Sequence, residues 1–191
     1  LVKAAVETPG LATVALTTNG VLLDHLARPL REAGLAQVNV SLDTLDAKRF
    51  RQLTRWGNLR DVLAGIESAE RAGLKIKLNA VVVRGLNDTD DAVALARLTL
   101  DRPWQVRFIE MMPFAGISDF QLSHSVPEEE LRATITTALG PLELCDEGRL
   151  DGEARVFRLP NAKGTLGFIS PVSKPFCAGC NRARLMADGM L

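Results

Sequence analysis

Four short segments of the chain alternate apolar and polar residues, as strands with one covered face do. They span residues 13–20, 37–43, 74–83 and 104–112. Segments between them place apolar residues three and four positions apart, which predicts helices. These are residues 22–34, 58–73 and 90–100, and the first two end at glycine. Serial strand–helix units predict parallel strands joined by right-handed crossovers.

The polar side of these strands carries charged and hydrogen-bonding groups. It comprises Thr17, Asn19, Asn39, Ser41, Asp43, Lys75, Lys77, Asn79, Gln105 and Arg107. If the helices cover the apolar side, the polar side lines an interior. The interior of an ordinary eight-stranded barrel is packed with branched apolar side chains, so polar groups there predict a cavity for a polar ligand. The alternative is a half-exposed sheet whose polar side faces water.

The pattern changes after residue 113. Residues 125–140 predict a helix with Ser125 as N-cap and Glu128 three positions later, the spacing of a capping box. Residues 154–160 and 164–171 alternate like an antiparallel hairpin that leads into a cysteine-containing loop. We therefore expect an α+β extension after the strand–helix units.

Composition narrows the classes of function. Lys plus Arg and Asp plus Glu both number 23, which argues against a nucleic-acid binder that relies on bulk charge. No apolar run approaches the roughly 18 residues of a membrane span, and no segment resembles a secretory leader. We expect a cytoplasmic protein with no membrane partner. Both ends of the sequence read as cut within larger elements, so we also expect a fragment.

Cys177 and Cys180 have the spacing of a metal-ligand pair. Half of a zinc site, a redox pair and part of an iron–sulfur run all use this spacing, and the sequence alone leaves zinc and iron–sulfur open. Cys145 lies in a weak context and is predicted to be a structural or incidental thiol. Arg182 and Arg184 place two cations beside the thiolates, which favours an anionic ligand such as a phosphorylated one.

Five motifs in this order carry a resemblance to a known family. They are "LTTNG", "NVSLDTLD", "KLNAVVVRGLND", "RFIEMMP" and "GFISPVSKPFCAGCNRARLMADG". In these motifs the chain resembles the GTP 3′,8-cyclases, a family of radical S-adenosylmethionine enzymes in molybdenum cofactor biosynthesis. The resemblance extends over nearly the whole chain, and the last motif is the most specific.

The resemblance implies a fold and a domain division. Residues 1–113 would form a partial, TIM-like radical-SAM parallel β/α barrel, and residues 114–191 an α+β extension carrying a second iron–sulfur site. In the family, a three-cysteine loop and two further strands precede the equivalent of residue 1. A third cysteine of the second cluster follows the equivalent of residue 191. This chain by itself is therefore not expected to catalyse a reaction.

The resemblance also implies site residues. Contacts to S-adenosylmethionine fall on Ser41, Asn79 and Met112. Contacts to GTP fall on Thr17, Lys77, Arg107, Arg182, Ala183 and Arg184, with Lys77 and Arg107 against the phosphates. The ligands of the second [4Fe–4S] cluster fall on Cys177 and Cys180.

The implied reaction converts GTP to (8S)-3′,8-cyclo-7,8-dihydroguanosine 5′-triphosphate. A 5′-deoxyadenosyl radical takes hydrogen from the 3′ carbon, and the ribose radical then attacks C8 of guanine. The implied cofactors are two [4Fe–4S] clusters and S-adenosylmethionine. The implied partners are an external electron donor and a downstream cyclic pyranopterin synthase, with a homodimer as one allowed assembly. Two alternatives stay open: a nucleotide-binding module with a zinc-stabilised tail, and another radical S-adenosylmethionine enzyme with an auxiliary cluster.

Overall fold

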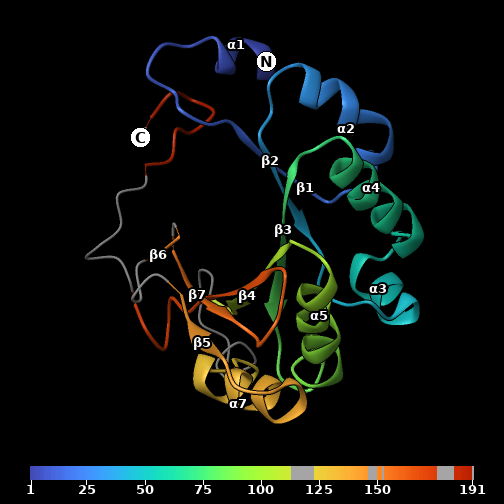
Figure 1. Ribbon diagram of the computed structural model, residues 1–191, viewed down its shortest axis with the longest axis vertical. Helices are drawn as coiled ribbons and strands as arrows, with labels where there is room; N and C mark the ends of the chain where they lie inside the picture. The colour runs from blue at the N-terminus through green and yellow to red at the C-terminus, as the bar shows by residue number, and fades with distance from the viewer. Residues whose placement is uncertain (113–122, 146–149, 152, 176–182, 191) are drawn as a thin grey trace.

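The strands form one mixed sheet (Figure 1). The computed structural model describes residues 1–112, 123–145, 150–151, 153–175 and 183–190. Within these ranges the sheet has eight strands: seven follow the order β1-β2-β3-β4-β8-β7-β5, and β6 pairs with β7 off this path. Their bounds are β1 Ala15–Thr18, β2 Gln37–Ser41, β3 Lys75–Val82, β4 Gln105–Glu110, β5 Glu143–Leu144, β6 Leu150–Asp151, β7 Ala154–Arg158 and β8 Thr165–Ile169. Strands β1 to β4 and β8 pair in parallel, whereas β5, β6 and β8 each pair with β7 antiparallel.

The predicted strand–helix order is confirmed. The described helices are α1 Val2–Val6, α2 Leu23–Glu32, α3 Ala47–Thr54, α4 Leu59–Arg71, α5 Asp90–Asp101 and α7 Glu128–Leu139. The helices predicted between the strands correspond to α2, α4 and α5. Gly34 and Gly73 follow the ends of α2 and α4 with φ angles of 94° and 77°. A glycine reaches this left-handed conformation without the steric cost that a Cβ adds, which explains why both helices stop there.

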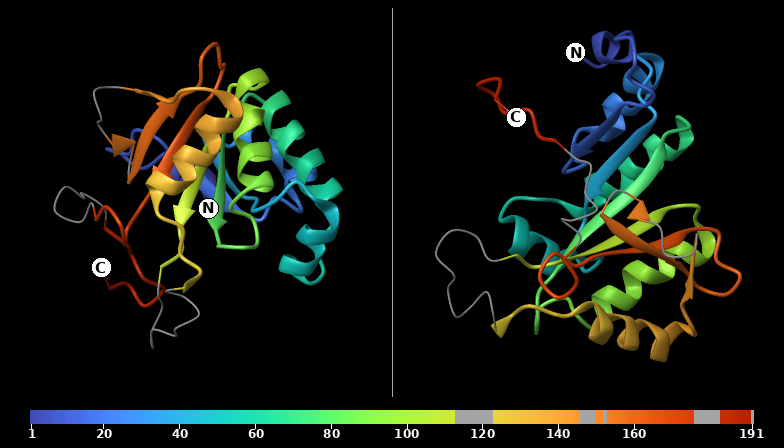
Figure 2. Two further views of the ribbon diagram at one scale, coloured as in Figure 1. Left: turned by 90° about the horizontal axis from the view of Figure 1, so that it is seen from below. Right: turned by 90° about the vertical axis from the view of Figure 1, so that its left-hand side faces the viewer.

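Helices α2, α4 and α5 cover one face of β1 to β4 (Figures 1 and 2). That face is apolar, as the alternation predicts: Val38 and Val40 of β2, Leu78 of β3 and Ile66 of α4 all belong to the buried core. Each such side chain contributes on the order of 1.5–3 kcal/mol when it leaves water. The covered face therefore supplies much of the stability and fixes which side of each strand stays open.

Helix α3 is absent from the sequence prediction. Asp46 caps it, because its Oδ1 accepts a hydrogen bond from the Arg49 N–H at 2.7 Å. Phe50 is the one buried residue of this helix and packs into the core. A helix of eight residues with a single buried side chain gives little periodic signal, although an Asp at its N-cap is readable.

The predicted hairpin is confirmed as β7 and β8, which pair antiparallel. Strand β8 also pairs in parallel with β4, so the hairpin continues the sheet of the strand–helix units. Phe168 of β8 packs against Phe108 of β4 and Phe157 of β7, with ring centroids 5.7 and 5.5 Å apart. The partial barrel and its α+β extension thus share one sheet, and the domain boundary near residue 113 stays a prediction.

The predicted capping box is wrong. Helix α7 begins at Glu128 after Pro127, and no side chain caps it. The Ser125 hydroxyl lies 3.5 Å from Glu110 Oε1 instead. The Glu128 carboxylate accepts hydrogen bonds from Arg155 and Ser170. A cationic donor and a buried hydroxyl outcompete a helix-end amide for this carboxylate, and the local sequence holds no sign of either partner.

Candidate functional site

The polar face of the sheet carries two rows of side chains that cross several strands. The first row is Thr17, Asn39, Lys77, Gln105 and Thr165, which are register partners across β1, β2, β3, β4 and β8. The second row, two residues closer to the carboxyl ends, is Ser41, Asn79, Arg107 and Gly167. Neighbours within a row are about 4.8 Å apart and the rows about 6.6 Å apart. The structure therefore brings five of the predicted site residues onto one face.

Arg107 is held in place by its neighbours. The residue is 8% exposed, and its Nε donates a hydrogen bond to Gln105 Oε1 at 2.7 Å. Its register partner on β8 is Gly167, where an added Cβ would lie 3.1 Å from Arg107 Cγ. Glycine at that position leaves room for the arginine stem, so residues of both β4 and β8 determine where the guanidinium lies.

Asn79 has a buried atom that lacks a partner. Its Oδ1 makes no hydrogen bond within the part of the chain that the structure describes. A buried amide oxygen without a donor costs on the order of 1–3 kcal/mol. Asn79 lies between Ser41 and Arg107 in the second row, so a ligand on this face that offers a donor would remove that cost.

A pocket of about 410 Å³ opens at the carboxyl ends of β1 and β2. Asn19, Ser41 and Asp43 line it from the strand ends, and Phe50 and Trp56 line it from α3 and the loop after that helix. Trp56 is 91% exposed. Polar strand ends facing aromatic rings suit a ligand with both charged and flat parts. The sequence pattern did not indicate the two aromatic residues, since α3 was not predicted.

Two side chains shape the strand ends beside this pocket. Burial raises the pKa of Asp43, and the hydrogen bond from the Val81 N–H to its Oδ1, at 2.8 Å, opposes that shift. Asn87 is buried and donates from Nδ2 to the carbonyl oxygens of Asp43 and Val81, both at 2.9 Å. Its Oδ1 accepts from the Val83 N–H at 2.8 Å. Asn87 therefore ties the end of β2 to the end of β3.

A second pocket, of about 500 Å³, lies at the amino ends of β2, β3, β4 and β8. Members of the first polar row line it: Lys77, Gln105 and Thr165. Further cations come from Lys75, Arg158 and Lys163. These cationic side chains around one opening favour an anionic group there.

The remaining predicted residues are placed in part. Met112 is exposed two residues beyond the end of β4. Ala183 and Arg184 are exposed, in a segment on the side of the sheet away from α2 and α4 (Figure 1). Cys177, Cys180 and Arg182 lie outside the described residues. Within the described ranges, no group of three or more His, Cys, Asp or Glu side chains is placed to hold a metal ion.

Comparison with known families decides the affiliation. The model of the Radical SAM superfamily matches residues 1–98, which is more than half of the chain. The chain belongs to the radical SAM superfamily. Membership implies an iron–sulfur cluster and S-adenosylmethionine as cofactors. Residues 104–191 match a second model, Molybdenum Cofactor Synthesis C.

Relatives within the radical SAM superfamily are similar in sequence over nearly the whole chain. GTP 3′,8-cyclase of Pelotomaculum thermopropionicum is 47% identical over 100% of this chain and 59% of the relative. The GTP 3′,8-cyclase of Moorella thermoacetica is 46% identical over 100% of this chain and 58% of the relative. That of Pseudomonas putida strain W619 is 47% identical over 96% and 55%. The chain spans less than three fifths of the length of these relatives.

A solved structure supports the fold. A radical SAM methyltransferase from Sphaerobacter thermophilus has a TM-score of 0.50 and 23% sequence identity, over 65% of this chain and 37% of that one. At this identity the likeness concerns the fold alone, and it confirms a partial TIM-like radical-SAM barrel. None of the helices within the described residues has the length and apolar character needed to cross a membrane.

Proposed function

We propose that the protein containing this chain is a GTP 3′,8-cyclase that converts GTP to (8S)-3′,8-cyclo-7,8-dihydroguanosine 5′-triphosphate. One observation carries this proposal. Asn79, a predicted contact of S-adenosylmethionine, is the register partner of Arg107, a predicted contact of the GTP phosphates. The two ligands must meet for hydrogen to pass from one to the other, and residues about 4.8 Å apart on one face suit adjoining subsites.

The cofactor subsite uses the carboxyl-terminal part of the polar face. Ser41 and Asn79 occupy the second row, and Met112 follows the end of β4. The Asn79 Oδ1 that lacks a partner within the described residues would accept a hydrogen bond from bound S-adenosylmethionine. These residues therefore fit the cofactor that the superfamily implies.

The substrate subsite uses the cationic part of the same face. Lys77 and Arg107 would bind the triphosphate, with Thr17 in the row of Lys77. Hydrogen bonds to charged groups contribute about 1.5–3 kcal/mol each, so two or three of them would account for selectivity for a triphosphate. Arg182, Ala183 and Arg184 would extend along the same substrate.

The cysteine pair supplies thiolates of the kind that iron–sulfur clusters require. Cys177 and Cys180 would be two ligands of a second [4Fe–4S] cluster, in addition to the one implied by the superfamily. When bound, the clusters and S-adenosylmethionine supply the radical chemistry, while the chain binds the nucleotide, orients it and excludes water.

The cellular context follows from the same proposal. The reaction would take place in the cytoplasm, with an external electron donor, and a cyclic pyranopterin synthase would consume the product. A homodimer is the assembly we would test first. We also propose that residues 1–113 form the barrel domain and residues 114–191 the extension.

The test uses the full-length protein, reconstituted anaerobically with iron and sulfide. GTP and S-adenosylmethionine with a chemical reductant should give 5′-deoxyadenosine and the cyclised nucleotide in equal amounts, measured by mass spectrometry. Two clusters require about eight iron atoms per chain. Zinc in place of iron would support the nucleotide-binding alternative. Formation of 5′-deoxyadenosine without consumption of GTP would support another radical S-adenosylmethionine enzyme.

A further inference from the structure

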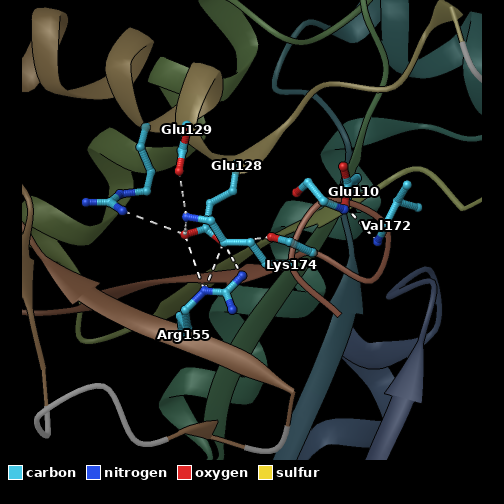
Figure 3. A network of polar contacts seen from close by, with 9 residues as sticks. Glu110, Glu128, Glu129, Arg155, Val172 and Lys174 are labelled. Carbon is cyan, nitrogen blue, oxygen red and sulfur yellow. Dashed lines mark hydrogen bonds and ion pairs between the residues drawn. The ribbon is translucent and has the colours of Figure 1, made fainter. Parts of the chain in front are cut away.

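Two buried carboxylates contact the chain segment that precedes the cysteine pair (Figure 3). This segment, residues 170–174, follows β8 and ends three positions before Cys177. Glu110 is the last residue of β4 and Glu128 the first residue of α7, so the two carboxylates come from different elements. Neither contact was predicted from the sequence.

Glu110 binds the backbone of this segment. The residue is buried, and its Oε2 accepts hydrogen bonds from the N–H groups of Val172 and Ser173 at 3.0 and 2.8 Å. Amide hydrogen bonds to an ionised carboxylate are about twice as strong as those between neutral groups. Glu110 therefore fixes two successive peptide units, and with them the direction of the chain.

Glu128 binds side chains at both ends of the segment. Its side chain is 1% exposed, accepts a hydrogen bond from Ser170 Oγ at 2.7 Å and lies 3.8 Å from Lys174 Nζ. Arg155 of β7 donates to the same carboxylate from Nε at 3.0 Å. Burial disfavours the ionised form, but the hydrogen bonds from Arg155 and Ser170 outweigh it and hold the pKa of Glu128 below its usual range.

We propose that Glu110 and Glu128 are positioning residues that set where Cys177 and Cys180 are presented. This inference rests on the proposed role of that pair as cluster ligands. Glu110 also lies two residues before Met112, so one residue couples the strand end beside the cofactor subsite to the cysteine segment. A purely structural role for the two carboxylates would change overall stability but not the chemistry of the cysteine pair.

The first measurement is hydrogen exchange of the Val172 and Ser173 amides in the full-length protein. Glu110→Ala should speed their exchange at least about tenfold, because both amides lose a charge-assisted hydrogen bond. Glu110→Gln keeps the shape and one accepting oxygen and should give a smaller increase. Glu130→Ala is the matched control: Glu130 lies on the same helix as Glu128 but pairs with Arg84 at 2.6 Å, away from the segment. It should leave both amides unchanged.

The second measurement is release of iron to a chelator. The Cys177→Ala/Cys180→Ala double variant defines the fraction of iron that depends on the pair. In Glu110→Ala and Glu128→Gln that fraction should leave about tenfold faster than in the unaltered protein and in Glu130→Ala, with the remaining iron unaffected. If Glu110→Ala does not fold, the Glu110→Gln and Glu128→Gln variants decide by the same readout.

The outcomes distinguish the proposed second cluster from the proposed positioning role of Glu110 and Glu128. If the double cysteine variant keeps the full iron content, the proposed second cluster is wrong, and the positioning role is overturned with it. If that variant loses iron but the Glu110 and Glu128 variants release it at the normal rate, only the positioning role is overturned. Faster amide exchange with unchanged iron release would overturn it equally.

Discussion

The two faces of β2 and β3 differ in what covers them. On one face Val38, Val40 and Leu78 are buried beneath α2 and α4. On the other, one residue along each strand, Ser41 is exposed and Asn79 is half-buried with an oxygen that finds no donor within the described residues. Successive side chains of a strand point to opposite faces of the sheet, so the groups that stabilise the fold lie on one face and those available to a ligand lie on the other. Substitutions on the covered face should therefore lower the free energy of unfolding, whereas substitutions on the open face should lower the affinity for a ligand.

The largest effect is expected on the covered face. Leu78→Ala would leave a cavity under α4 and lower the free energy of unfolding by about 2–5 kcal/mol, since the side chain is 0% exposed and the site cannot collapse fully. Urea unfolding of the full-length protein measures this. Lys77→Ala, one residue away on the open face, should change the same quantity by less than about 1 kcal/mol. Equal losses in the two variants would contradict the separation of the faces.

On the open face, Lys77→Ala should weaken GTP binding by about 10- to 100-fold, because a charge-assisted hydrogen bond is lost. Binding of S-adenosylmethionine should change little. Isothermal titration measures both affinities. Lys48→Ala, at an exposed position of α3, is the control for loss of one positive charge. Equal losses for the two ligands would refute the division of the face into two subsites.

The contacts of Arg107 should give a smaller effect on the same face. Gln105→Leu removes the acceptor of the Arg107 Nε hydrogen bond, and Gly167→Ala places a Cβ 3.1 Å from Arg107 Cγ. Each should weaken GTP binding by about three- to tenfold, less than removal of a cation that contacts phosphate. Gln105→Glu keeps an acceptor but adds a negative charge beside the phosphates, so it should not restore affinity. The comparison is GTP against guanosine: if both lose affinity equally, Arg107 does not act on the phosphates.

Sequence patterns predicted most of the helices and strands within the first 112 residues, and less of the structure in the later part of the chain. Alternation and helical spacing determine which residues can be buried, and that sufficed for β1 to β4 and for the face shared by Thr17, Lys77 and Arg107. The parallel pairing of β8 with β4 depends on contacts more than 50 residues apart, which no local pattern encodes. The same holds for Glu110, whose amide partners are 62 and 63 residues away.

The smallest effects concern two carboxylates whose pKa values move in opposite directions. Burial disfavours ionised Glu128, but hydrogen bonds from Arg155 and Ser170 outweigh burial and lower its pKa, so its folded-state contribution is complete above the unfolded-state pKa and disappears as pH falls through the folded-state pKa. Burial raises the pKa of Asp43, so ionisation of Asp43 opposes folding once pH rises above its unfolded-state pKa.

Glu128→Gln should therefore lower the free energy of unfolding at neutral pH, with the deficit shrinking in acid. Asp43→Asn should lose least at neutral pH and most in acid, where Asp43 is protonated in both states and its burial penalty is absent. Urea unfolding between about pH 3 and 7 measures both curves, and parallel curves for the two variants would show that the carboxylate on the open face is no less paired than the one in the network.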